Sequence, residues 1–334
     1  MSRRVNFSEF LKNNILIFVI IFVFIIGILV SKNFMTVGNI KNILFNIAVI
    51  GLLAIGQTIV MLVKEIDLSI SSLMAFAPIA AISITKYIKS LSGIELIEGG
   101  QYVTSGLAYI FIFTILVGII IGVINGLITV KAKVPSIIVT LGMMYTLRGF
   151  AYIISKGRPL ELIKVEGFKW LGVSTFFQVP VSFFIYIIIG IIGILVLKYT
   201  KVGSRIYATG GNEKAAIYSG INTDTWKIIA FTFCGFCASI AALVYSSRLE
   251  SVEAAQATGY ELSAIAIVVI GGTTLQGGRG RLLGTMLSTL ALALIINVID
   301  FIGLVSWYQT VIMGLIIIAA AFLYLRRTTI QNHV

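Results

Sequence analysis

Long apolar runs separated by short polar segments set the pattern of this chain. A helix needs roughly 17 to 25 residues to cross about 30 Å of hydrocarbon, and runs near that length with almost no charge recur about ten times. The pattern predicts an all-α, polytopic integral membrane protein, a bundle of about ten transmembrane helices. The runs are Ile15–Val30, Asn42–Val63, Leu68–Thr85, Ser105–Val130, Val134–Ser155, Val181–Leu197, Ile228–Ser247, Leu262–Gln276, Leu282–Ile299 and Trp307–Leu325.

The composition supports the same class of protein. Hydrophobic residues make up 58% and charged residues 11% of the chain, which would leave a water-soluble fold with too little polar surface. The longest polar stretches, 156–180 and 199–226, are too short for a soluble domain. We therefore interpret residues 1–334 as a single transmembrane domain. The first run follows Arg3 and Arg4 with no cleavage site after it, so we expect a retained signal anchor.

Lysine and arginine are distributed unevenly between the predicted loops. The positive-inside rule places loops rich in these residues on the cytoplasmic side. With a cytoplasmic N-terminus, about fifteen of the 25 fall inside and about nine outside, and most carboxylates also fall outside. Ten helices with both termini cytoplasmic satisfy the rule. We therefore attribute the net charge of +12 to basic residues in the cytoplasmic loops of a membrane protein, and not to a nucleic-acid-binding surface.

Two features that could indicate chemistry are interpreted structurally. Cys234 and Cys237 form a C-x-x-C inside an uncharged run, far along the chain from its single histidine, so we expect packing residues and no metal site. The glycine cluster at 271–280 lacks the Lys-Ser/Thr pair of a phosphate-binding loop. With Gly277 and Gly278 it is expected to form a structural turn at the cytoplasmic face. No catalytic residue is predicted.

Two charged residues fall where a membrane makes them costly. An Asp at the centre of a spanning helix costs roughly 2.5 to 3.5 kcal/mol, so Asp67, between the second and third runs, is expected to cap the next helix with Ser69 nearby. Direct contact of Asp67 with a substrate is the alternative. Arg148 interrupts the fifth run and is expected to pair with a carboxylate.

Uncharged polar side chains within the runs are candidates for a transport path. A neutral solute needs only a few weak polar partners to cross, whereas interhelical hydrogen bonding, worth roughly 0.6 kcal/mol on average, is the other role for such residues. We expect at least two members of the set to line a cavity. The set is Gln57, Asn125, Thr140, Asn297 and Gln309.

The segment Gly203–Ile221 is polar and rich in Gly and Ala, although long apolar runs flank it. Asn212 can cap a short helix, Glu213 favours its first turn, and Gly220 ends it. Such a helix would lie outside the bilayer, as a docking surface or as an ordinary capped loop. The segment resembles the loop by which membrane subunits of ABC importers engage their ATPase.

Four blocks of sequence carry a wider resemblance: Gly56–Ser69, Ile124–Gly149, Gly203–Ile221 and Ala257–Thr285. Together they resemble a ribose-type permease of the branched family of ABC importers that serves ribose and other monosaccharides, along most of the chain. Family members usually have Gly where this chain has Glu65. That departure puts the backbone shape of the turn in question.

The resemblance implies a permease subunit in a bacterial cytoplasmic (inner) membrane, paired with a second permease copy. A cytoplasmic ABC ATPase would bind ATP, so the permease would need no cofactor and would not be an enzyme, and an extracytoplasmic binding protein would deliver a sugar, ribose first. Permeases for autoinducer-2, nucleosides, hexoses or inositol remain alternatives, as does an ion-coupled secondary transporter. Within a coupling loop at 199–226, the ATPase-coupling residues would be Gly210, Gly211, Asn212, Glu213, Ala215, Ala216 and Gly220.

A faint internal echo relates residues 66–73 to residues 275–284, because each is a polar turn between two apolar runs. A two-fold internal repeat is one interpretation. Chance similarity of apolar segments is the other.

The charge asymmetry generates a topology prediction. In a variant with Cys234 and Cys237 changed to Ser, single cysteines at Ser92 and Ser174 should react with an impermeant thiol reagent added to intact cells, because both positions are predicted outside. A cysteine at Ser219 should react only after the membrane is opened. Labelling at Ser219 from outside would refute the ten-helix arrangement.

Overall fold

The computed structural model describes residues 15–91, 105–162 and 167–303, with the isolated positions 308, 311, 312, 314, 315 and 318. Within these residues the chain is overwhelmingly helical, and the all-α, polytopic class is confirmed. Seven helices are long and apolar enough to cross a membrane, and two further apolar helices are shorter. The nine are α2 Ile15–Val30, α3 Val37–Leu62, α4 Ile70–Leu91, α5 Ser105–Lys131, α6 Ser136–Ser155, α8 Val181–Tyr199, α11 Thr223–Leu249, α12 Tyr260–Ile270 and α13 Leu282–Ile302.

These nine helices correspond to nine of the ten predicted runs. The tenth run, Trp307–Leu325, falls largely outside the described residues, as does Ser92. The largest differences from prediction are at the ends of α4 and α12: α4 continues to Leu91 and not Thr85, and α12 ends at Ile270 and not at Gln276. There Gly272 adopts a φ of 91°, and its N–H donates to the carbonyl of Val269, so the glycine cluster turns the chain early.

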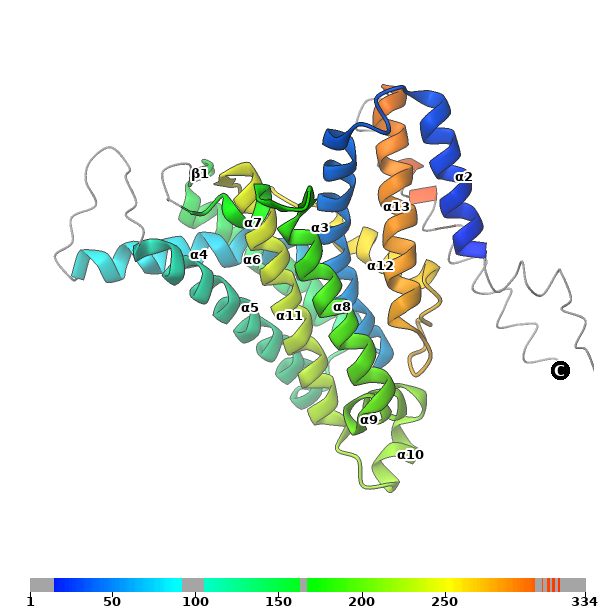
Figure 1. Ribbon diagram of the computed structural model, residues 1–334. Coiled ribbons are helices and arrows are strands. Elements are labelled where there is room, and N and C mark those ends of the chain that lie inside the picture. Colours follow the sequence, from blue (N-terminus) through cyan, green and yellow to red (C-terminus); the bar gives the residue numbers. More distant parts are fainter. Residues whose placement is uncertain are drawn as a thin grey trace, which may run out of the picture.

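Short elements mark the two ends of the bundle (Figure 1). At one end lie α9 Lys201–Gly211 and α10 Glu213–Tyr218. At the opposite end lie α7 Trp170–Val173 and two antiparallel strand pairs: β1 Leu160–Glu161 with β4 Ser251–Val252, and β2 Thr175–Phe176 with β3 Val179–Pro180. We term the first the inner end and the second the outer end, following the charge rule.

Local capping explains where several helices begin. Thr36 precedes α3, and its Oγ1 accepts a hydrogen bond from the N–H of Asn39 at 3.4 Å. Asn222 precedes α11, and its Oδ1 accepts from the N–H of Thr225 at 3.2 Å. Both are preferred N-cap residues because their side chains satisfy donors that the first turn leaves free. A glycine ends α13: Gly303 follows its last residue, Ile302, and adopts a left-handed φ of 76°.

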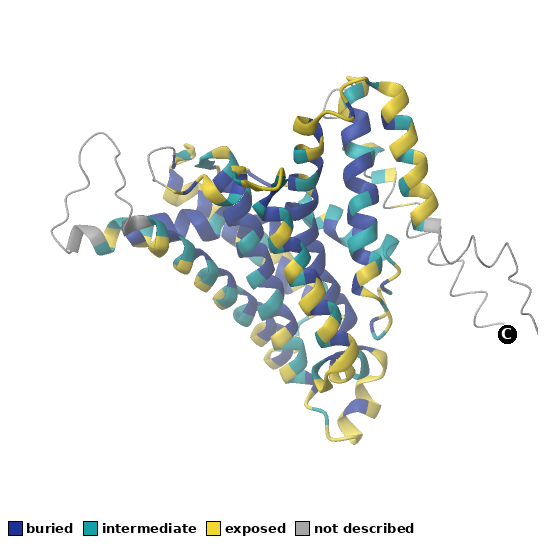
Figure 2. Ribbon diagram, in the orientation of Figure 1, coloured by how far each residue is buried: buried dark blue, intermediate teal, exposed yellow. Residues whose placement is uncertain are grey.

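The helices divide into a buried centre and an exposed periphery (Figure 2). Most of α3 is buried, whereas α5, α6 and α8 leave most of their residues at least partly exposed. The large exposed side chains on these peripheral helices, and on α2, are chiefly apolar. Lipid tails are themselves apolar, so exposed apolar side chains are expected on helices that face the membrane. α3 therefore forms the axis of the subunit, and α11 packs against both α3 and α5.

Glycines let α5 and α11 approach closely. Gly118, Gly122 and Gly126 recur every fourth residue on α5, the small-xxx-small spacing typical of tight membrane helix pairs. A Cβ added to Gly122 would lie 2.4 Å from the carbonyl oxygen of Phe231 on α11. On the facing helix, a Cβ on Gly235 would lie 2.1 Å from the carbonyl oxygen of Gly118. The backbones are thus in direct contact along this seam.

The cysteines occupy the other face of α11. Cys234 and Cys237 are buried and free of any disulfide. A Cβ added to Gly56 of α3 would lie 3.0 Å from the Cα of Cys234 and 3.2 Å from the Cβ of Cys237. Both thiols therefore fill a narrow space between α3 and α11, as expected of small packing residues.

The α5–α11 seam gives a stability prediction. Gly122→Ala should destabilise the protein by roughly 1 to 3 kcal/mol, the usual cost of overpacking, because the added methyl group meets backbone that cannot rotate away. The measurement is the thermal unfolding midpoint of the purified protein in detergent. The matched control is Gly142→Ala in α6, where an added Cβ meets nothing within 4 Å. Equal midpoints for the two variants would contradict the seam.

Candidate coupling and transport site

The loop at the inner end folds as two helices that its own side chains cap. The Oγ1 of Thr200 accepts from the N–H of Val202 at 3.2 Å at the start of α9. The Oδ1 of Asn212 accepts from the N–H of Ala215 at 3.1 Å at the start of α10. Beyond α10, Gly220 adopts a φ of 78°, and its N–H donates to the carbonyl of Ile217 at 2.9 Å. The short helix thus begins after Asn212 and ends before Gly220, as predicted.

Helix α10 presents an exposed surface with two large apolar side chains. Glu213 and Ala215 are exposed, whereas Ala216 is buried within the subunit. Ile217 and Tyr218 follow, 55% and 91% exposed. Sequence reasoning did not single out this pair, although two bulky apolar residues in an otherwise polar loop were the available signal. These two exposed side chains are adjacent in sequence and lie at the C-terminal end of α10.

The end of α9 touches two other segments through backbone atoms. Gly210 is buried, and a Cβ there would lie 1.8 Å from the carbonyl oxygen of Leu62, at the end of α3. The N–H of Gly278 donates to that same carbonyl at 2.9 Å. A Cβ on Gly277, which has a φ of 77°, would lie 2.6 Å from the Cβ of Lys64. The predicted glycine turn, just before α13, therefore packs against the ends of α3 and α9.

An ion bridge connects α10 to the segment after α3. The Nζ of Lys227, in α11, lies 3.0 Å from the Oε1 of Glu65 and 2.9 Å from the Oε1 of Glu213. The side chains of Lys227 and Glu65 are only 15% and 13% exposed. Solvent screens such a pair less than a surface ion pair. One partly buried ammonium group thus joins the first turn of α10 to the turn that follows α3.

The bridge also bears on the departure from the family pattern at Glu65. The positive φ in this turn belongs to Lys64, at 68°, and not to Glu65. The backbone at Glu65 is therefore one that any residue adopts, and its side chain is committed to Lys227.

Between α3 and α4 the chain is non-helical, and Asp67 and Ser69 within it are buried. The Oδ1 of Asp67 accepts from the N–H and the Oγ of Ser69, at 2.8 Å and 2.6 Å. The Nδ2 of Asn125, in α5, donates to the Oγ of Ser69 at 2.9 Å. Burial raises the pKa of the Asp67 carboxyl, and the hydrogen bonds from Ser69 and Asn125 partly oppose that shift. These bonds hold the turn that leads into α4.

Side chains from two more helices satisfy the backbone of this segment. The N–H of Ile66 donates to the Oγ of Ser136 at 3.1 Å, and its carbonyl accepts from the Oγ1 of Thr140 at 3.2 Å. The amide of Gln57, in the orientation that satisfies both of its atoms, donates to the carbonyl of Asp67 at 3.1 Å and accepts from its N–H at 3.3 Å. Backbone groups that are removed from water and lie outside a helix require such partners.

The structure thus brings together three of the five polar residues selected for a transport path, Gln57, Asn125 and Thr140, and all three are fully buried. Asn297 lies at the opposite, outer end, where it exchanges two hydrogen bonds with Asn39. Gln309 falls outside the described residues. In the single subunit each of the three makes a hydrogen bond to protein, but the buried Oδ1 of Asn125 has no partner among the described residues. Contact of these residues with a solute stays a prediction.

Arg148 differs from expectation in its partners. Its Nη1 donates to the backbone carbonyls of Ala254 and Gln256, at 2.5 Å and 2.9 Å, where the sequence suggested a carboxylate. A guanidinium has five donors and is satisfied by carbonyl oxygens as well as by acids. The residue therefore ties α6 to the segment between β4 and α12.

The family of the chain follows from comparison with known proteins. The chain belongs to the family described as branched-chain amino acid transport system / permease component, whose profile matches residues 39–321. It is therefore a membrane permease, a transport subunit and not an enzyme. The match confirms the resemblance carried by the four sequence blocks.

Individual relatives cover nearly the whole chain. It is 38% identical to the ribose import permease protein of Escherichia coli (strain K12) over 87% of this chain and 86% of the relative. It is 33% identical to the ribose import permease protein of Bacillus subtilis (strain 168), over 91% and 89%. It is 30% identical to an autoinducer 2 import system permease protein of Yersinia enterocolitica, over 93% and 82%. No solved structure matches the chain.

The ion bridge gives a second stability prediction. Lys227→Met should destabilise the protein by up to about 3 to 5 kcal/mol, because it leaves the largely buried Glu65 carboxylate beside Glu213 without a counter-charge. Adding Glu65→Gln to that variant should restore part of the loss. The measurement is again the thermal midpoint in detergent.

The control for Lys227 is another ion pair at the same end of the bundle. Lys131 lies 3.8 Å from Asp224, and their side chains are 69% and 49% exposed. Lys131→Met should cost less than about 1 kcal/mol, the range of surface pairs. A Lys227→Met midpoint equal to that of Lys131→Met would contradict a structural role for the bridge.

Proposed function

We propose that this chain is the permease subunit of an ATP-driven importer that moves ribose, or a similar monosaccharide, across the bacterial cytoplasmic membrane. The observation that carries the proposal is the 38% identity to a ribose import permease over 87% of the chain. The capped, exposed helix α10 supports it, because an importer of this kind needs a cytoplasmic surface on which an ATPase can dock.

The proposed assembly has three kinds of partner. A cytoplasmic ABC ATPase binds ATP and docks on α10, so the permease itself holds no cofactor. An extracytoplasmic binding protein delivers the sugar at the outer end, and a second permease copy completes the path. Ten spanning helices with both termini cytoplasmic fit this arrangement, since α9 and α10 then lie on the ATPase side.

The contact between α10 and the bundle suggests how ATPase closure reaches the membrane. Force applied to α10 passes to Glu65 through Lys227, and force applied to α9 passes to α3 through Gly210 and Leu62. Both routes end at the buried turn that Asp67 and Ser69 form. Within the coupling set, Ala216 then acts by packing α10 onto the subunit, and the neighbouring exposed residues meet the ATPase.

A second candidate substrate is autoinducer 2. The chain is 30% identical to a permease of an autoinducer 2 import system over 93% of its length. The identity to the ribose import permeases is higher, so ribose is the first substrate to test.

The proposal is tested by reconstituting the permease with its ATPase and a ribose-binding protein in proteoliposomes. Ribose uptake should require ATP. Tyr218→Asp should reduce both uptake and ATPase co-purification at least about tenfold, equivalent to about 1.4 kcal/mol of lost binding, because it places a charge in the apolar contact.

Phe177→Asp is the matched control, since Phe177 is an aromatic residue 84% exposed at the opposite end. It should leave ATPase co-purification unchanged. Ribose uptake without ATP would instead identify a secondary transporter. ATP-dependent uptake of autoinducer 2 but not of ribose would favour the second candidate.

A further inference from the structure

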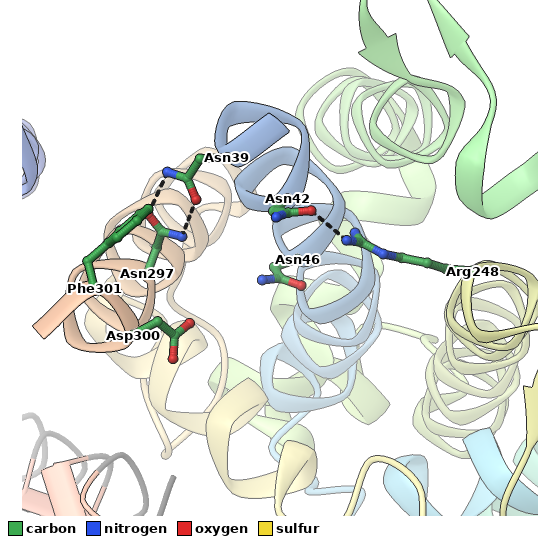
Figure 3. Close-up of a pocket in the computed structure, with 7 residues that line it drawn as sticks. All are labelled: Asn39, Asn42, Asn46, Arg248, Asn297, Asp300 and Phe301. Carbon is green, nitrogen blue, oxygen red and sulfur yellow. Dashed lines mark hydrogen bonds between the residues drawn. The ribbon is translucent and has the colours of Figure 1, made fainter. Parts of the chain in front are cut away.

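A polar pocket of about 330 Å³ lies at the outer end of the bundle (Figure 3), and α10 lies at the opposite end (Figure 1). Three helices build it near their outer ends: the start of α3, the end of α11 and the end of α13. Four of its seven lining residues are asparagines. The lining consists of Asn39, Asn42, Asn46, Arg248, Asn297, Asp300 and Phe301.

The asparagines of α3 form one face of that helix. Asn39, Asn42 and Asn46 are spaced by three and four residues, so their side chains project in the same direction. Asn46 lies about 13 Å below the first residue of α3, at a rise of about 1.5 Å per residue. An amide that faces hydrocarbon at this depth loses its hydrogen bonds to water. This face of α3 is therefore built to meet water, a polar ligand or protein.

Part of the pocket is fixed by its own hydrogen bonds. Asn39 and Asn297 exchange two amide hydrogen bonds, of 2.9 Å and 2.8 Å. Arg248 donates to the Oδ1 of Asn42 at 2.5 Å, and its guanidinium lies 4.1 Å from the centre of the Phe45 ring. These contacts hold the walls of the pocket in place without a ligand.

Asn46 is different, because it is exposed and has no hydrogen-bonding partner within the described part of the chain. Figure 3 shows its amide beside the pocket on α3, with Asp300 on the α13 side. Asn46 thus offers both a donor and an acceptor to a molecule inside the pocket.

We propose that this pocket binds a neutral, polyhydroxylated small molecule of monosaccharide size as it passes from the binding protein into the permease. The proposal deepens the sugar-import function proposed above and rests on it. Each hydroxyl group of a sugar both donates and accepts, as each asparagine amide does. The volume lies at the lower end of the range for small-molecule pockets.

The charges of the pocket favour a neutral ligand. Among the seven lining residues, Arg248 contributes one positive and Asp300 one negative charge, so the formal charges of the lining cancel. A single carboxylate among amides is also too few acidic ligands for a divalent cation site. An amino acid could pair its two charges with these residues, but Arg248 is already engaged by Asn42 and Phe45. Weak amide contacts also suit a path that must release its solute.

The direct test uses a single cysteine in the pocket. In the background with Cys234 and Cys237 changed to Ser, Asn46→Cys should react with an impermeant thiol reagent from outside. Saturating ribose should slow that reaction about tenfold, since only the free site reacts, and leucine should not. No protection by ribose, xylose or glucose would overturn the proposal, as would protection by leucine alone.

The transport test separates this inference from the proposed function. Asn46→Leu should lower ribose uptake at least about tenfold, equivalent to about 1.4 kcal/mol, while assembly with the ATPase persists, and Asn46→Gln should recover part of the rate. Thr146→Leu, at an exposed position of α6, is the control and should transport normally.

Failure of the pocket inference and failure of the proposed import function give different results. If the unaltered protein transports ribose and Asn46→Leu does so equally well, the pocket inference fails alone. If the unaltered protein transports no ribose, the proposed function fails, and the labelling experiment with neutral sugars still decides the pocket.

Discussion

The subunit is organised around the need to satisfy the buried, non-helical backbone between α3 and α4. Buried peptide groups have no water to bond, so protein must supply each partner. Here Gln57 of α3, Ser136 and Thr140 of α6 and, through Ser69, Asn125 of α5 supply them. Removing any of these polar groups would leave a buried donor or acceptor unpaired, which costs more than the bond itself contributes. Three helices are consequently held around one short turn.

The same turn lies next to the surface that faces the cytoplasm in the proposed topology. Lys227 joins Glu65 to Glu213, and Gly210 packs on Leu62 with no side chain between them. A stiff, short connection transmits displacement better than a flexible loop, since closely packed groups respond together. Helix α10 and the turn that contains Asp67 are therefore connected through contacts of a few ångströms. The outer asparagine pocket lies at the other end of α3, so one helix spans from the pocket to the turn.

The sequence predicts which residues belong to much of the candidate site, but not how those residues contact one another. The sequence pattern identified Asn212 and Gly220 as helix boundaries because capping is local, and the structure agrees. It could not place Ala216 in the interior or Tyr218 on the surface, because a six-residue helix has no periodicity long enough to define its buried face. Nor could it pair Glu65 with Lys227, or Asn39 with Asn297, since those contacts join helices distant in sequence.

The class of protein, the approximate positions of the nine longer apolar helices and the family were predictable from the sequence, because apolar length, charge distribution and motif blocks are properties of local segments. Which polar residues meet depends on how the helices pack. Gln57, Asn125 and Thr140 converge on Asp67, while Asn297 lies at the opposite end with Asn39. The physical reason is that a polar group in a membrane must find a partner, but its own segment does not specify which helix supplies it.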